Sequence, residues 1–186
     1  GVSGDDVTEG TLSVSALTLT AANWDQFQTV TITGVDDFVQ DGNQSYTFVT
    51  ASAVSSDPNY SNRVADDVGL VNNDNDTAGF VFGGTPITVQ ETTNNTSFTI
   101  FNVKLQSQPT SDVTFSLSSN DPGEGSVCAS LTDTSCALNT KTLTFTSANW
   151  DQAQGVRVRG IDDALIDGIQ DFLIISTIAS SLDTNF

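Results

Sequence analysis

Two stretches of the chain gather carboxylates at a spacing that could hold a metal ion. Gly34 to Gly42 reads GVDDFVQDG and Gly160 to Gly168 reads GIDDALIDG, so each has two adjacent Asp residues and a third Asp after three intervening residues. Like charges this close repel one another, and a cation would relieve the repulsion. Oxygen ligands without Cys or His suit Ca²⁺, which takes about six to eight oxygens, better than Zn²⁺ or Cu²⁺. The alternative reading is a solvated acidic loop.

Other acids lie in loops that could bring them to the same end of a fold. Asp6 and Asp121 follow predicted strands in matching loops, and Glu91 lies in ITVQETT. Asp74 and Asp76 belong to the segment NNDND. These acids form short clusters at the ends of apolar-alternating segments instead of spreading evenly, and this placement favours cation sites over a diffuse acidic surface.

The overall charge and the missing residue types exclude several functions. The 23 acidic residues face only 5 Lys and Arg, which gives a net charge of −18 and argues against nucleic acid or an anionic membrane as a partner. The absence of His excludes His-dependent catalytic groups and His-containing zinc sites within this chain. A two-carboxylate glycosidase is disfavoured, because adjacent Asp residues on a hairpin point to opposite faces and polar turns offer no desolvated pocket. We therefore predict that the chain is not an enzyme.

The two acidic segments lie within an internal duplication. Residues 17–48 and 143–174 align without a gap at 16 identities in 32 positions, and both contain NWDQ. Further upstream, DVTEG at 6–10 matches DPGEG at 121–125 at a smaller offset, so the second copy carries about 11 extra residues that include CASLTDTSC. We assign residues 1–76 to the later part of a first copy and 77–186 to a second copy without its last strand.

Neither copy is complete in this assignment. The first copy lacks a counterpart of residues 79–115, and the second lacks a counterpart of residues 61–76. Two explanations stay open: the chain is a fragment of a longer array, or neighbouring chains supply each other's missing strands.

The local pattern predicts an all-β fold. Alternation of apolar and polar residues predicts strands in TVTITG (29–34) and GVRVRG (155–160). Further strands are expected within 45–54, 97–105, 112–119 and 141–146, which are rich in Thr, Val, Phe and Ile and are separated by turn residues. No helix is expected. Trp24 and Trp150, next to predicted turns, are expected to cap the core or to pack under a loop, and not to bind a ligand.

The two cysteines predict a disulfide that closes a short loop. Cys128 and Cys136 are eight residues apart, a spacing that suits a disulfide better than a metal site. A disulfide indicates an oxidising compartment outside the cytoplasm. The sequence contains no run of 18 apolar residues, so no membrane-spanning helix is predicted.

The order of these motifs resembles the Calx-beta domain. ITVQE, SSNDPGEG and LTFTSANWDQAQGVRVRGIDDALIDGIQDF follow one another as that family's early Glu, loop and acidic hairpin do. The resemblance implies tandem immunoglobulin-like antiparallel β-sandwiches, each binding Ca²⁺ at one end. In the second copy it implies as ligands Glu91, Asp121, Asp162, Asp163, Asp167 and the carbonyl of Leu165. In the first copy it implies Asp6, Asp36, Asp37, Asp41, Asp74, Asp76 and the carbonyl of Val39.

This sequence also departs from the family pattern. Phe38 and Ala164 stand where the family has a third consecutive Asp, and the later acidic run is thinned to DGNQ and DGIQ. We therefore expect fewer ions or weaker binding than the full pattern would give.

These observations predict a non-catalytic, secreted or cell-surface module that Ca²⁺ rigidifies. It would form part of a long surface, adhesive or filament-forming protein and contact neighbouring repeats or identical chains. The alternative function is a module that binds carbohydrate or a protein ligand, with Tyr60, Phe80 and Phe82 as candidate contacts.

Overall fold

A computed structural model of the chain describes residues 2–177 and 179–186. Within these residues the fold is all-β, with twelve strands in antiparallel sheets and no helix, as the sequence predicted. It follows that no helix of this part is long and apolar enough to cross a membrane. The chain divides into two compact units: unit 1 is Gly1–Asp37 with Asp41–Asn75, and unit 2 is Phe38–Gln40 with Asp76–Phe186.

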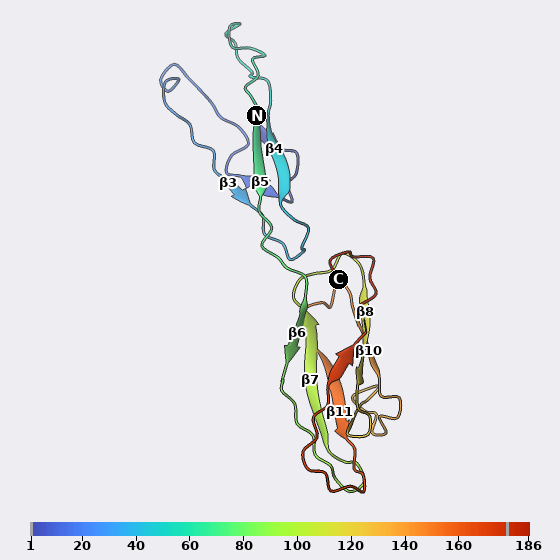
Figure 1. The fold of residues 1–186 in the computed structure, drawn as a ribbon. Coiled ribbons are helices and arrows are strands. Elements are labelled where there is room, and N and C mark those ends of the chain that lie inside the picture. Colours follow the sequence, from blue (N-terminus) through green and yellow to red (C-terminus); the bar gives the residue numbers. More distant parts are fainter. Residues whose placement is uncertain (1, 178) are drawn as a thin grey trace. The chain divides into compact units, whose positions relative to one another are not determined.

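Unit 2 has two sheets with a shared apolar core (Figure 1). One sheet has the order β6 (Phe80–Gly83), β7 (Phe98–Leu105), β11 (Gln154–Gly160), β9 (Gly125–Val127). The other has the order β10 (Lys141–Phe145), β8 (Val113–Ser119), β12 (Ile174–Ser176). Buried side chains of both sheets form one cluster: Phe101, Val103, Leu105, Val113, Phe115, Leu117, Val127, Leu143, Phe145, Val156 and Val158. Alternate residues of β8 are buried, as expected for a strand with one face on a core.

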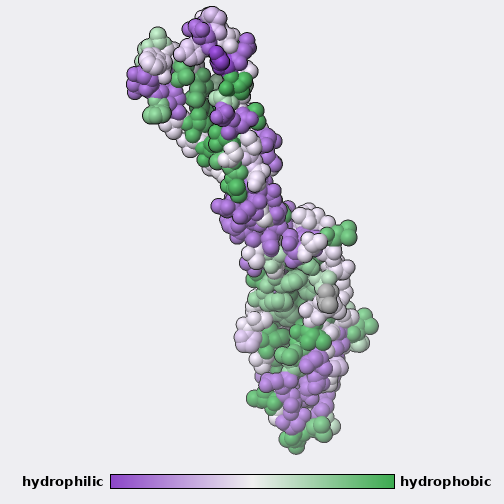
Figure 2. Space-filling model, turned by 45° about the horizontal axis from the view of Figure 1, so that its top comes forward, coloured by the Kyte–Doolittle hydropathy of each residue, from purple (hydrophilic) through white to green (hydrophobic). Residues whose placement is uncertain are grey.

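Unit 1 has smaller sheets and a thinner core. A three-stranded sheet has the order β1 (Val2–Gly4), β4 (Gln44–Thr50), β5 (Val68–Asn72), and β2 (Gly10–Leu12) pairs with β3 (Ile32–Gly34). Tyr46 and Phe48 are its buried large apolar side chains among the described residues. Figure 2 shows hydrophobic residues at the surface of both units. Phe27 of unit 1 is fully exposed.

Strand pairing repeats between the two units with the same offsets as the aligned sequence segments. The pairs Gly10↔Gly34 and Leu12↔Ile32 of unit 1 correspond to Gly125↔Gly160 and Val127↔Val158 of unit 2. Likewise, the β1–β4 register of unit 1 recurs between β8 and β12: Val2↔Thr50 and Gly4↔Phe48 correspond to Leu117↔Ser176 and Ser119↔Ile174. Each of these matches adds 115 to the first residue and 126 to the second. The duplication is therefore structural as well as sequential.

The NWDQ turns are also the same in both units. The side-chain Oδ1 of Asn149 accepts a hydrogen bond from the backbone N of Thr146 at 2.7 Å, and Asn23 Oδ1 accepts one from Thr20 N. Such Asn-to-backbone bonds stabilise a tight turn locally. The repeated Asn is thus explained by a turn that precedes the β11 strand and its counterpart.

The two Trp residues of these turns differ. Trp150 packs against the core of unit 2, and its ring centroid lies 5.6 Å from that of Phe38, one of three residues of the first acidic segment that belong to unit 2. The prediction of a core-capping Trp is therefore confirmed for Trp150. It is wrong for Trp24, which is 71% exposed. Unit 1 has no packed layer over that turn among its described residues.

Some predicted strands of the first copy are shorter than their second-copy counterparts. β11 pairs with β7 along one edge and with β9 along the other, whereas β3 has only β2 as a neighbour and spans three residues. The described part of unit 1 contains no counterpart of β7. A strand needs a hydrogen-bonding partner, so the pattern TVTITG yields a strand only where β2 provides one.

Candidate metal centre

Three carboxylates from two loops of unit 2 lie close enough to bind one ion. Glu124 precedes β9, and Asp163 and Asp167 lie in the loop after β11. One carboxylate oxygen of each lies within 4.8 Å of the others, and in the described part of the chain this is the only such group of three acidic or metal-ligating residues. Two oxygens bound to the same Ca²⁺ at about 2.3–2.6 Å can be at most about 5 Å apart. The spacing of the three oxygens therefore fits a shared Ca²⁺.

Three further acids surround this group. Partial desolvation raises the pKa of Glu91, and the charges of Asp163, Asp167 and Asp162 raise it further. Partial desolvation likewise raises the pKa of Glu124, with contributions from Asp167, Asp121, Asp163 and Glu91. Both desolvation and neighbouring carboxylates disfavour the charged form of a carboxyl group, and a divalent cation relieves both effects. We call these six residues the acidic cluster: Glu91, Asp121, Glu124, Asp162, Asp163 and Asp167.

Backbone hydrogen bonds position the loops of the acidic cluster. The backbone N of Ile161 donates to the carbonyl of Glu124 at 3.0 Å, which joins the start of the β11 loop to the β9 loop. The N of Asp162 donates to Asn95 Oδ1, which joins it to the loop before β7. In Figure 1 the loops before β7 and after β11 meet at one end of unit 2. The fold of unit 2 thus brings together acidic residues that are far apart in sequence.

Turns within each loop orient the carboxylates. Asp163 Oδ1 accepts a hydrogen bond from Leu165 N at 2.6 Å. Asp121 Oδ1 accepts one from Gly123 N at 3.1 Å. Gly168 has a φ of 81°, a conformation that favours glycine, and it ends the acidic hairpin just after Asp167. The remaining carboxylate oxygens of Asp163 and Asp167 can therefore face the same space as Glu124.

The structure brings together the predicted acidic ligands of the second copy. Asp163 and Asp167 belong to the group of three, the charges of Glu91 and Asp121 act on Glu124, and the charge of Asp162 acts on Glu91. Leu165, predicted to contribute its carbonyl, lies on the same hairpin with its side chain 68% exposed.

Glu124 was not among the predicted ligands. Its signal was present in the duplication: the pair Glu-Gly occurs as Glu9-Gly10 in the first copy and as Glu124-Gly125 in the second. Both Glu carbonyls accept a hydrogen bond, at 3.0 Å, from the first residue after a period-two strand, Val35 or Ile161. Comparing the two copies position by position would have ranked this Glu with the Asp residues.

The predicted ligands of the first copy do not form a comparable group among the described residues. Asp6, Asp36, Asp37, Asp41 and Asp74 belong to unit 1, whereas Val39 and Asp76 belong to unit 2. Hydrogen bonds from the Thr8 side chain and backbone lower the pKa of Asp6. Asp74 Oδ2 accepts a hydrogen bond from Gly42 N at 2.7 Å, which holds the strand end of β5 against the acidic hairpin of its own unit.

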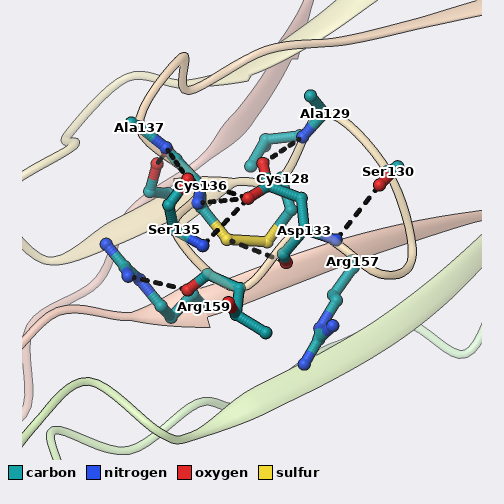
Figure 3. Close-up of a disulfide and its surroundings, with 12 residues drawn as sticks. Cys128, Ala129, Ser130, Asp133, Ser135, Cys136, Ala137, Arg157 and Arg159 are labelled. Carbon is teal, nitrogen blue, oxygen red and sulfur yellow. Dashed lines mark hydrogen bonds between the residues drawn. A yellow bond between two sulfur atoms is a disulfide. The ribbon is translucent and has the colours of Figure 1, made fainter.

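The predicted disulfide is present. Cys128 and Cys136 are bonded and buried, and they close a loop that follows β9 (Figure 3). Asp133 organises this loop by accepting hydrogen bonds at Oδ1 from the N and Oγ of Ser135, at 2.9 and 2.8 Å. These bonds lower the pKa of Asp133. Arg157 and Arg159 of β11 donate to the loop carbonyls of Leu131 and Thr134, at 2.7 and 3.1 Å.

Comparison with protein-family models, with curated proteins and with solved structures found no match. The functional assignment therefore depends on the geometry and electrostatics of the chain itself. The acidic cluster is the part of that geometry with the clearest chemistry.

Proposed function

We propose that the chain is a non-catalytic structural or adhesive repeat module whose acidic cluster binds Ca²⁺. The module would consist of immunoglobulin-like, Calx-beta-like repeats within a long secreted or cell-surface protein. Bound Ca²⁺ would hold together the loops before β7, before β9 and after β11, and so rigidify one end of the sandwich.

The observation that carries this proposal is the convergence of Glu124, Asp163 and Asp167 within 4.8 Å. All the available ligands are oxygens, which suit Ca²⁺. Partial desolvation and, after it, neighbouring carboxylates raise the pKa of Glu91 and Glu124, and a bound cation would offset both effects. The disulfide between Cys128 and Cys136 supports a location outside the cytoplasm.

Thermal unfolding tests the proposal. Ca²⁺ that binds only the folded protein at a hundredfold excess over Kd stabilises it by about 2.7 kcal/mol, which corresponds to a rise of about 10 °C in the Tm of a domain of this size. We expect this rise in the transition of unit 2 on going from EGTA to Ca²⁺. Mg²⁺ should give a much smaller rise, because it demands shorter bonds and near-octahedral geometry.

Two variants locate the effect. Glu124→Gln removes one carboxylate of the group of three and should abolish most of the Ca²⁺-dependent rise. Asp151→Asn, a matched change of an exposed acid on the NWDQ turn, should leave the rise intact. Identical unfolding curves in Ca²⁺ and EGTA for the unaltered chain would contradict the proposal and mean that the acidic cluster is a solvated surface that binds no ion.

The alternative of a carbohydrate-binding module gains less from the structure. Phe80 packs edge to face against Phe115, with ring centroids 4.7 Å apart, and also contacts Phe186. Phe82 contacts Phe101, with centroids 6.5 Å apart. These two rings therefore serve packing, and only Tyr60, which is 64% exposed, presents most of its surface to solvent.

A further inference from the structure

Unit 2 has a groove along an open side of its sandwich. The groove has a volume of about 770 Å³, and its walls are formed by residues 82–89 on one side and residues 169–176 on the other. Phe101 and Leu117 of the core contribute to its floor. The wall formed by residues 169–176 includes β12, which is an edge strand with β8 as its neighbour.

Unit 1 shows which strands pair with the counterpart of β12. β4 corresponds to β12 and its preceding residues, and β4 is a central strand with β1 on one side and β5 on the other. The β1 side is reproduced in unit 2: Asp5 N donates to the Thr47 carbonyl at 3.0 Å in unit 1, and Asn120 N donates to the Leu173 carbonyl at 3.0 Å in unit 2. The β5 side has no counterpart among the described residues of unit 2.

The backbone of the groove wall is oriented for an added strand. In an antiparallel sheet the N–H and C=O groups of successive residues point to opposite neighbours. Since those of Leu173 face Asn120, those of Phe172 and Ile174 face the groove. Their counterparts in unit 1, Tyr46 and Phe48, pair with Leu70 and Val68 of β5.

Burial of the corresponding side chains differs between the two units. Tyr46 and Phe48 are 5% and 2% exposed beside β5. Phe172 and Ile174 are only partly buried, although they pack against a larger core. The apolar surface that β5 covers in unit 1 is thus open to the groove in unit 2.

We infer that this groove is a β-strand acceptor site whose partner is an extended segment with the chemistry of β5. The sequence V-G-L-V-N followed by N-D-N-D, Val68 to Asp76, defines that chemistry. The segment adds to the free edge of β12 in the register of the β4–β5 pair, so that its Leu70 position enters the groove opposite Phe172. This is strand addition, in which main-chain hydrogen bonds give affinity and alternate side chains give specificity.

The partner strand also links the groove to the acidic cluster, and this part of the inference depends on the proposed function. In unit 1 the strand end reaches the acidic hairpin: Asn72 Nδ2 donates to Glu9 Oε2 at 3.2 Å and to the Val35 carbonyl at 2.6 Å, and Gly42 N donates to Asp74 Oδ2. The counterparts of Glu9 and Gly42 in unit 2 are Glu124 and Gly168. A bound strand therefore brings its Asp74 position to the acidic cluster, where Ca²⁺ would strengthen its binding.

A synthetic peptide of residues 66–76, DDVGLVNNDND, tests the acceptor with the full chain. Fluorescence anisotropy of the labelled peptide should show saturable binding at one peptide per chain. Leu70→Asp in the peptide should weaken binding at least about tenfold, since the Leu position is the apolar anchor. Absence of saturable binding, or equal binding of the Leu70→Asp peptide, would overturn the inference.

Cross-linking tests the register. In unit 1 Ser45 is opposite Val71, so Asp171 is the predicted partner of the Val71 position. A peptide with Val71→Cys, activated as a mixed disulfide, should couple to a chain with Asp171→Cys and couple poorly to a chain with Ile175→Cys, an exposed position on the same strand. Equal coupling at both positions would mean non-specific adhesion, and a chain that dimerises in light scattering and is not displaced by peptide would mean that a second copy fills the groove. Either result overturns the inference.

The dependence on Ca²⁺ separates this inference from the proposed function. Ca²⁺ should tighten peptide binding severalfold, and Asp74→Asn with Asp76→Asn in the peptide should remove that gain. In-register binding that is the same in Ca²⁺ and EGTA would support the acceptor and contradict its link to the metal. A Ca²⁺-dependent Tm without any peptide binding would leave the proposed function standing and overturn the acceptor.

Discussion

Individual carboxylates of the acidic cluster differ from the other acids of the chain in the direction of their pKa shifts. Hydrogen bonds lower the pKa of Asp6 and Asp133, whereas desolvation and neighbouring charges raise the pKa of Glu91 and Glu124. The first kind of acid is stabilised as an anion by its own loop. The second kind is destabilised as an anion by its surroundings.

The raised pKa values predict how stability without Ca²⁺ depends on pH. Because the folded-state pKa of Glu91 and Glu124 lies above the reference value of 4.5, the folded state takes up protons first as the pH falls. Their contribution to stability is therefore complete below about 4.5 and is lost as the pH rises through the folded pKa. In EGTA, the Tm of unit 2 should gain less on acidification from pH 7 to 5 when both residues are changed to Gln.

The comparison needs a control for general charge effects. A chain with Asp25→Asn and Asp151→Asn, two exposed acids of the NWDQ turns, should keep the pH dependence of the unaltered chain. Equal pH dependence in all three proteins would contradict the electrostatic coupling of the two Glu residues.

Much of the candidate site could be predicted from residue types and their spacing in the sequence. Paired Asp residues on one hairpin were recognisable because they are local in sequence, and five of the six acids of the acidic cluster were predicted. Glu124 was not predicted from spacing along the chain, because it reaches Asp163 through sheet pairing between β9 and β11; in the sequence only its match with Glu9 in the duplication points to it.

At the scale of elements, pairing decides whether an alternating sequence becomes a strand. The runs 97–105, 112–119 and 155–160 were predicted as strands, and each contributes a strand with a paired neighbour in unit 2. The equivalent pattern at 29–34 yields only a short β3. Local alternation therefore predicts which segments can form strands, whereas the length of each strand depends on which neighbouring strands it can pair with.

The disulfide loop is an element whose stabilisation can be measured. Closing a loop with a sequence separation of 8 removes unfolded-state entropy worth about 2–3 kcal/mol. Replacing both Cys128 and Cys136 by Ser should lower the stability of unit 2 by about that amount in denaturant unfolding. The same loss should follow reduction of the unaltered chain.

The hydrogen bonds of Asp133 provide the competing explanation for loop order. If they alone hold the loop, the double Ser variant will unfold at the same denaturant concentration as the unaltered chain. That result would contradict a stabilising role for the disulfide.

At the scale of the whole molecule, the two units differ in how much core they have. Unit 2 buries eleven apolar residues in one cluster, whereas Tyr46 and Phe48 are the buried large apolar side chains in the described part of unit 1. Stability is therefore expected to be uneven, because opening a region with few buried contacts costs less free energy. The sequence predicted two incomplete copies, but not that one would be so much better packed.

Hydrogen exchange measured by mass spectrometry should show this difference. Amides of β7, β8 and β11 should exchange slowly, and those of β2 and β3 should exchange at least about a hundredfold faster, since a difference of about 3 kcal/mol in opening free energy gives that ratio. Ca²⁺ should add protection to the loop after β11. Equal protection of β3 and β11 would contradict the difference in core size as the determinant of local stability.

The claim that Ca²⁺ binds the acidic cluster is tested most directly by crystals of the chain grown in Ca²⁺ and measured for anomalous scattering. We predict an anomalous peak bound by carboxylate oxygens of Glu124, Asp163 and Asp167 at about 2.3–2.6 Å. Carboxylates that point apart into solvent at saturating Ca²⁺, with no peak between them, would contradict the account.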